Sequence, residues 1–165
     1  MDMVLTRRYF LTLFHLDTDG PEWYTRCGWM SELDECTWYG VGCSEGPDGT
    51  SLTSLSLMSN NLGNGIPTYL GTFRDLEILD LTNNIFESSL PTELFLLTNL
   101  HTITFRSSRL TGTIPSGLGK LTNLVYMYFG RDAADGAFMS GTLPSEIGFL
   151  TSLGKIVAAW HLSIL

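Results

Sequence analysis

The sequence contains little positive charge and no long apolar run. Nine lysines and arginines stand against 17 acidic residues in a chain of 165, and the formal net charge is −8 at pH 7. Because nucleic-acid binding depends on basic side chains that neutralise phosphates, this composition argues against a nucleic-acid partner. No apolar run approaches the roughly 18–20 residues that a transmembrane helix needs, so we expect no membrane span in this chain.

Residues for catalysis or metal binding are also scarce. The three histidines, His15, His101 and His161, are far apart in the sequence, and no Ser-His-Asp order is visible. Residues 17–20, DTDG, resemble the start of a calcium loop, but Gly28 occupies the position where such a loop needs a bidentate acid. We therefore expect no enzyme activity, no cofactor and no metal site.

The sequence lacks an Asn-x-Ser/Thr site for glycosylation, and its N-terminus is a poor signal peptide. Residues 9–16 could form a short signal core, but they lead into DTDG rather than into small residues. A helix over about residues 2–16 is the better interpretation. Four apolar residues share one face of that predicted helix: Leu5, Tyr9, Leu13 and Leu16.

Only three cysteines are present, Cys27, Cys36 and Cys43, all near the N-terminus. An odd number allows at most one internal bridge, with three possible pairings. No histidine lies at metal-ligand spacing from them, so zinc is a poor explanation. A bridge confined to this end would suit a local staple and an oxidising compartment.

What the sequence does contain is a repeat of constant length. Four leucines open successive units at equal intervals: Leu52, Leu76, Leu100 and Leu124. A fixed period in this range indicates a solenoid. Alternating apolar residues in each unit predict one short strand per coil, and the stacked coils bury their inward leucines in one core. Asn60 and Asn84 recur at the following turn, where an amide side chain can pair with backbone groups.

Two features together resemble plant-type leucine-rich-repeat proteins. Residues 36–43, CTWYGVGC, follow a tryptophan-rich stretch and look like the N-terminal cap of that class. The repeats match its pattern, LxxLxLxxNxLxGxIPxxLxxLxxL, and the resemblance covers about residues 23–162. It implies an α/β solenoid, a right-handed coil with a short-stranded parallel sheet on its concave face and a helical, cysteine-containing cap. Within that cap, Cys36 and Cys43 are the candidate disulfide pair.

Composition and period predict the domain boundaries. Residues 1–50 form the cap, with the helix and a Trp/Cys-rich segment at 23–43, and residues 51–165 form four complete repeats and a truncated fifth. The fourth unit is five residues longer than the others, which predicts a rim loop within residues 130–137. Because the fifth unit lacks a closing cap, we expect a fragment of a longer protein or a C-terminal edge that a partner covers.

The resemblance also implies a function. The class includes receptor-like kinase ectodomains and polygalacturonase-inhibiting proteins, so we expect a non-enzymatic, extracellular or cell-surface recognition module whose concave face binds a peptide, glycan or protein. A secreted inhibitor of a cell-wall hydrolase is the alternative. A kinase domain, if the full-length protein has one, is not in this chain.

The repeat frame gives the outward strand positions, and the candidate ligand-binding residues are four of these and one neighbour. They are Asp80, Arg106, Tyr126 and Tyr128, with Arg131 directly after the strand of the fourth unit. Tyrosine and arginine dominate binding hot spots because they combine a large contact area with polar groups. The same frame predicts that Thr82 and Thr104 are also outward and exposed.

Overall fold

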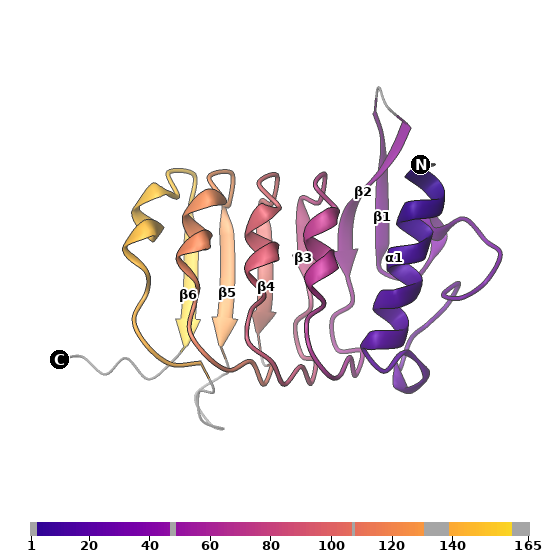
Figure 1. Ribbon diagram of the computed structural model, residues 1–165, viewed down its shortest axis with the longest axis horizontal. Coiled ribbons are helices and arrows are strands. Elements are labelled where there is room, and N and C mark those ends of the chain that lie inside the picture. Colours follow the sequence, from indigo (N-terminus) through magenta and orange to yellow (C-terminus); the bar gives the residue numbers. More distant parts are fainter. Residues whose placement is uncertain (1–2, 47–48, 107, 131–138, 160–165) are drawn as a thin grey trace.

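The computed structural model describes residues 3–46, 49–106, 108–130 and 139–159, which form a stack of coils (Figure 1). The helix and strands in chain order are α1 (Met3–Asp17), β1 (Val41–Gly46), β2 (Gly49–Ser56), β3 (Ile78–Asp80), β4 (Thr102–Arg106), β5 (Tyr126–Gly130) and β6 (Lys155–Ala159). Within these described residues, six short 3₁₀ helices lie between them: η1 (Gly20–Glu22), η2 (Glu35–Thr37), η3 (Thr68–Thr72), η4 (Thr92–Leu96), η5 (Ser116–Lys120) and η6 (Ser145–Phe149). No helix in the described part of the chain is both long and apolar enough to span a bilayer.

The strands form one sheet in chain order, with β1 antiparallel to β2 and all later neighbours parallel. Ile78, Thr102 and Tyr126 are aligned across β3, β4 and β5, so these coils advance by the interval that separates the opening leucines. Tyr126 is aligned with Lys155, which makes the next coil five residues longer. The predicted rim loop falls largely on residues 131–138, outside the described residues.

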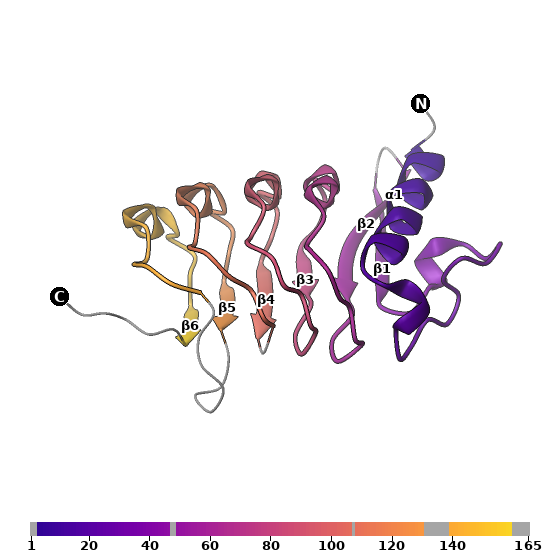
Figure 2. The same ribbon diagram turned by 60° about the horizontal axis from the view of Figure 1, so that its bottom comes forward.

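Each coil returns along the far side of the solenoid through a 3₁₀ helix. The helices η3 to η6 each follow a proline: Pro67, Pro91, Pro115 and Pro144. The backbone is extended at each proline and leads at once into a helical turn. Figure 2 shows these turns fanned apart more widely than the strands, so the sheet lies on the concave side.

The inward side chains of the strands share a core that runs along the stack. Four of them occupy equivalent positions and are completely buried: Leu55, Leu79, Ile103 and Met127. The rings of Phe105 and Phe129 stack in the same core with centroids 5.8 Å apart. Burial of each such side chain contributes about 1.5–3 kcal/mol of transfer free energy, so this ladder is the main source of stability.

Asn84 links two coils through its buried amide. Its Oδ1 accepts hydrogen bonds from the backbone N–H groups of Asn60 (3.1 Å) and Leu62 (3.0 Å). Its Nδ2 donates to the carbonyl of Leu57 at 2.8 Å. Ser108 takes the equivalent place in the next coil, where its buried Oγ has no hydrogen-bond partner among the described residues. The amide of Asn84 therefore makes hydrogen bonds to backbone groups of the turn, and the shorter side chain of Ser108 does not reach the equivalent groups.

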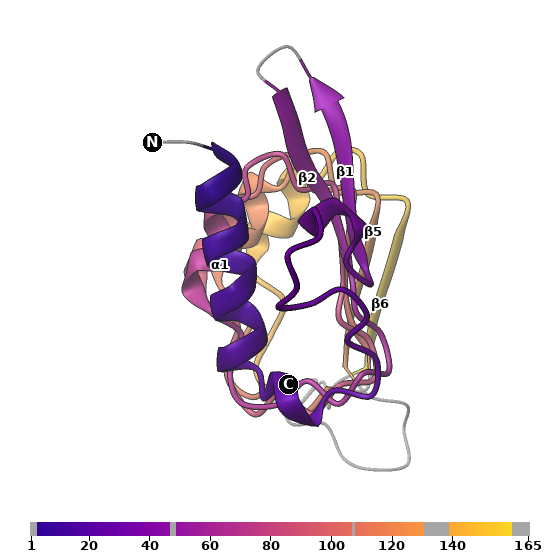
Figure 3. The same cartoon turned by 90° about the vertical axis from the view of Figure 1, so that its right-hand side faces the viewer.

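Helix α1 covers the N-terminal end of the core, on the side opposite the sheet (Figure 3). The spacing of its apolar residues selects the wrong face as the inner one. Leu5, Tyr9 and Leu16 are 65%, 59% and 52% exposed and Leu13 is half-buried, whereas Leu11 and Phe14 are completely buried. The tryptophans of the cap decide which face turns inward, because the ring of Phe14 packs edge-on against that of Trp23.

A buried ion pair joins α1 to the rest of the cap. Arg7 Nε donates to Oε1 of Glu35 at 2.7 Å, and another of its nitrogens donates to the carbonyl of Thr50 at 2.6 Å. Arg8 pairs with the second oxygen of Glu35 at 3.0 Å. Glu35 is completely buried, so its carboxylate depends on these two arginines for its hydrogen bonds.

A disulfide closes the loop that begins directly after Glu35. It joins Cys36 to Cys43, with Cα atoms 5.6 Å apart, and it is the pair that the resemblance implies. Cys27 is an exposed free thiol. The three cap tryptophans, Trp23, Trp29 and Trp38, pack in series in the same part of the chain.

Candidate binding surface on the concave sheet

Two tyrosines of β5 form the centre of the candidate surface. Tyr126 and Tyr128 are both half-buried and stand two residues apart. Because alternate residues of a strand point to the same face, both rings lie on one side of the sheet. The register places Tyr126 between Thr102 of β4 and Lys155 of β6.

Each of these rings has a cation from a neighbouring strand above it. Arg106 Cζ lies 5.4 Å from the ring centroid of Tyr128, and Lys155 Nζ lies 5.7 Å from that of Tyr126. Such contacts contribute about 0.5–1 kcal/mol each at exposed sites. They hold long, flexible side chains in place, so the surface presents ordered positive charge on both flanks of β5.

Two threonines that the repeat frame predicts to be exposed are buried. Thr82 and Thr104 are 8% and 5% exposed, and their hydroxyls are 2.9 Å apart, within hydrogen-bond distance. The prediction is wrong because a short side chain lies below its larger neighbours: Thr104 pairs in register with Tyr128. The two threonines therefore form part of the floor of the surface rather than its contact layer.

Asp80 lies at the N-terminal side of this surface, on β3. It is half-buried, and its Oδ1 accepts a hydrogen bond from the backbone N–H of Thr82 at 3.0 Å. That bond orders the end of β3 and leaves the second carboxylate oxygen for other contacts. Asp80 thus brings an acidic group to a surface whose other charged members are cations.

The predicted site residues on β3, β4 and β5 lie on adjacent strands. Arg131 and His161 lie outside the described residues. The predicted site does not include Lys155, although the repeat frame gives it the same position in its strand as Tyr126. We add Lys155 to the site because its ammonium group contacts the ring of Tyr126. Among the described residues, no group of three or more His, Cys, Asp or Glu side chains could hold a metal ion. We define the concave surface as Asp80, Arg106, Tyr126, Tyr128 and Lys155.

Comparison with known families agrees with this architecture. The family model described as Leucine Rich Repeat matches residues 51–73 and 75–97, which run from β2 to the end of the second coil. This chain contains leucine-rich repeats and has the leucine-rich-repeat fold. A search by sequence among curated proteins finds no match to this chain.

Solved structures with the same fold include plant receptor ectodomains. The plant peptide hormone receptor RGFR1, solved in complex with RGF2, is 30% identical, with a TM-score of 0.59 over 72% of this chain. The ectodomain of the plant membrane receptor kinase GASSHO1/SCHENGEN3 from Arabidopsis thaliana is 26% identical, with a TM-score of 0.65 over 88% of this chain. This chain spans only 20% of each of those two chains. A plant ice-binding protein is also similar, at 21% identity and a TM-score of 0.76, over 92% of this chain and 46% of that one.

Proposed function

We propose that this chain is a recognition module whose concave surface binds a peptide or an extended segment of a protein. The observation that carries this proposal is the pair of tyrosines on β5, each held under a cation from an adjacent strand. Aromatic rings and arginines supply most of the energy in binding hot spots. RGFR1, a peptide hormone receptor with the same fold, supports a peptide rather than a glycan.

The size of the sheet limits what the concave surface can hold. Five strands, β2 to β6, at about 4.8 Å spacing span roughly 24 Å, and five-residue strands are about 16 Å long. The resulting face of about 400 Å² is half of one partner's share of a standard protein interface. An extended peptide of about seven residues would cross it, since each residue of such a chain adds about 3.4 Å.

The charges of the surface favour a ligand with an acidic group near an apolar one. Arg106 and Lys155 flank the two rings, so a carboxylate can pair with either cation while an apolar side chain packs against the tyrosines. Asp80 would disfavour a second acidic group at the β3 end. Inhibition of a cell-wall hydrolase gains no specific support from this geometry.

We expect the module to act outside the cell. The cap disulfide requires an oxidising compartment to persist. The similarity to the ectodomain of GASSHO1/SCHENGEN3, a membrane receptor kinase, supports the same placement. An extracellular module would meet peptides at the cell surface.

A selection from a library of random heptapeptides tests the proposed function. We expect the selected peptides to bind the native chain and to lose at least about tenfold in affinity when Tyr126 and Tyr128 are both replaced by alanine, since each is a hot-spot candidate. Arg106→Ala should weaken peptides with an acidic residue more than neutral ones.

The matched control is Tyr24→Ala, which removes a tyrosine that is 77% exposed on the cap. Unchanged affinity in the double alanine variant, with its fold intact by circular dichroism, would exclude the concave surface as the binding site. If the chain binds glycans on an array and no peptide, the ligand is a glycan. The concave surface then remains the proposed site only if the double alanine variant loses the glycan.

A further inference from the structure

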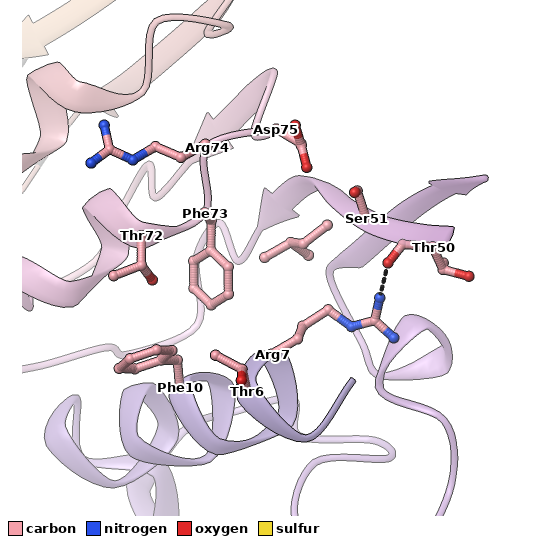
Figure 4. A pocket seen from close by; sticks show the side chains of 10 residues that line it. Thr6, Arg7, Phe10, Thr50, Ser51, Thr72, Phe73, Arg74 and Asp75 are labelled. Atoms are coloured by element: carbon pink, nitrogen blue, oxygen red, sulfur yellow. Dashed lines mark hydrogen bonds between the residues drawn. The ribbon is translucent and has the colours of Figure 1, made fainter. Parts of the chain in front are cut away.

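A second concave feature, a pocket of about 220 Å³, lies between α1 and the first coil (Figure 4). It shares no residue with the concave surface. Its apolar lining consists of Phe10 from α1, Leu52 from β2 and Phe73 from the loop after η3. Phe73 and Leu52 belong to the core, so they give the pocket a rigid floor.

Polar groups from all three elements surround that floor. Figure 4 shows Thr6 beside Phe10, and Ser51 close to Asp75 at the opposite end. Arg7 also lines the pocket, but it is buried and shares the carboxylate of Glu35 with Arg8. Arg74 points away from the pocket and donates to a backbone carbonyl of the next coil. Asp75 is exposed at the rim, so its carboxylate is the acidic group that an occupant of the pocket would meet.

Exposed apolar side chains continue from the pocket onto the outer face of α1. Tyr9 packs edge-on against Phe10 with ring centroids 5.5 Å apart, and Leu5 lies one turn earlier on the helix. Tyr9 and Leu5 are 59% and 65% exposed; Tyr9 contacts the lining residue Phe10, and Leu5 directly precedes the lining residue Thr6 in the chain. An apolar patch around a hollow is typical of a site that binds another protein.

The volume of the pocket limits its occupant to a single side chain. A cavity of about 150 Å³ accommodates benzene, whereas pockets for drug-sized ligands begin at about 300 Å³. A phenyl or phenol ring therefore fits, and a larger free ligand does not. Residues 1–50 carry nine acidic and three basic side chains, a net charge of −6, and Asp75 adds a further negative charge at the rim.

We propose that this pocket, together with Leu5 and Tyr9, docks a protein segment that inserts one aromatic side chain flanked by lysine or arginine. The ring is buried against Phe10 and Phe73, and a flanking ammonium or guanidinium pairs with Asp75. The negative cap attracts basic segments from a distance and repels acidic ones. This interaction is independent of ligand binding on the concave sheet.

Nuclear magnetic resonance titration of the ¹⁵N-labelled chain tests this docking site with three synthetic peptides, KKFKK, KKGKK and EEFEE, capped at both ends. We expect KKFKK to shift the backbone amides of Phe10, Ser51 and Asp75 in a saturable way. KKGKK should bind at least about tenfold more weakly, because it lacks the ring that the pocket buries. EEFEE should bind more weakly still.

Two pairs of variants separate the ring from the charge. Asp75→Asn should weaken KKFKK about two- to fivefold, as expected for an exposed ion pair, whereas Glu32→Gln removes the same charge elsewhere on the cap and should have no effect. Thr6→Trp should fill the pocket and abolish binding, whereas Thr12→Trp on the same helix should not. If Thr6→Trp does not fold, the comparison of Asp75→Asn with Glu32→Gln still shows whether the charge of Asp75 contributes to binding.

Three results would overturn the proposal. Equal binding of EEFEE and KKFKK would remove the charge selectivity. Shifts confined to β4, β5 and β6 would place the peptide on the concave surface instead. A dimer in sedimentation equilibrium that Thr6→Trp dissociates would show that a second copy of the chain, rather than a basic partner segment, covers the patch.

Discussion

At the scale of single residues, His15 is a polar side chain that is buried among the aromatic rings of the cap. It is 6% exposed, its ring lies 4.8 Å from that of Trp23 and 5.9 Å from that of Trp29, and the backbone of Gly20 lies against it. Burial lowers the pKa of His15, the positive charge of Arg26 lowers it further, and the Gly20 backbone opposes them in part. The folded cap therefore favours the neutral imidazole.

This shift predicts that acid destabilises the cap. Because the folded pKa of His15 is below the unfolded value of about 6.5, the unfolded chain takes up a proton first as the pH falls. The contribution of His15 to stability is thus fully present above that unfolded pKa and declines below it. We expect the thermal midpoint to fall between pH 7.5 and pH 5.5, and His15→Phe to reduce that fall. His101→Gln, at an exposed position, is the control; equal pH dependence in both variants would contradict the assignment.

At the scale of elements, α1 shows that tertiary packing decides which face of a helix is buried. The helix has two candidate faces, one with Leu5, Tyr9, Leu13 and Leu16, and one with Leu11 and Phe14. The second turns inward because it offers a large ring to the tryptophans and places Arg7 beside Glu35. The spacing of apolar residues alone favours the face with Leu5, because the other face carries Arg7 and a charged residue is typical of the side of a helix that faces water.

Substitutions on the two faces of α1 should have opposite consequences for stability. Leu5→Ser and Tyr9→Ser should change the free energy of unfolding by less than about 0.5 kcal/mol, because these side chains are already in water. Phe14→Ala should cost about 3–5 kcal/mol through the lost burial and the cavity it leaves. Urea titration measures all three. A loss in either serine variant above about 2 kcal/mol, the lower bound for truncating a core leucine, would mean that this face is packed in solution.

At the scale of the whole molecule, the repeat predicts the fold well and the site only in part. The constant period predicts the parallel register, because one inward leucine per coil must meet the next in the same core. The period does not predict how deep each outward residue lies, as Thr104 shows, since depth depends on the size of neighbours in other strands. The contacts of Lys155 and Arg106 with their rings depend on side-chain conformation, which a column of outward positions does not specify.

The cap disulfide should affect the stability of the whole chain. A bridge that closes a short loop stabilises a chain by about 2–4 kcal/mol, largely through the unfolded state. We expect native protein to contain one reactive thiol, that of Cys27, and reduction to expose two more and lower the thermal midpoint. Cys27→Ser should leave the midpoint unchanged. Three reactive thiols before reduction would contradict both the bridge and the extracellular proposal.

The alignment of Tyr126 with Lys155 has a consequence for how such a chain can vary. These residues stay in register although the coil between them is five residues longer than its predecessors, so strand spacing does not depend on the length of the connection between strands. Residues can therefore be added between two coils without tilting the rings and cations that face a ligand. The length of a connection and the composition of the binding face are separate variables, and an engineer could change either one while the other stays as it is.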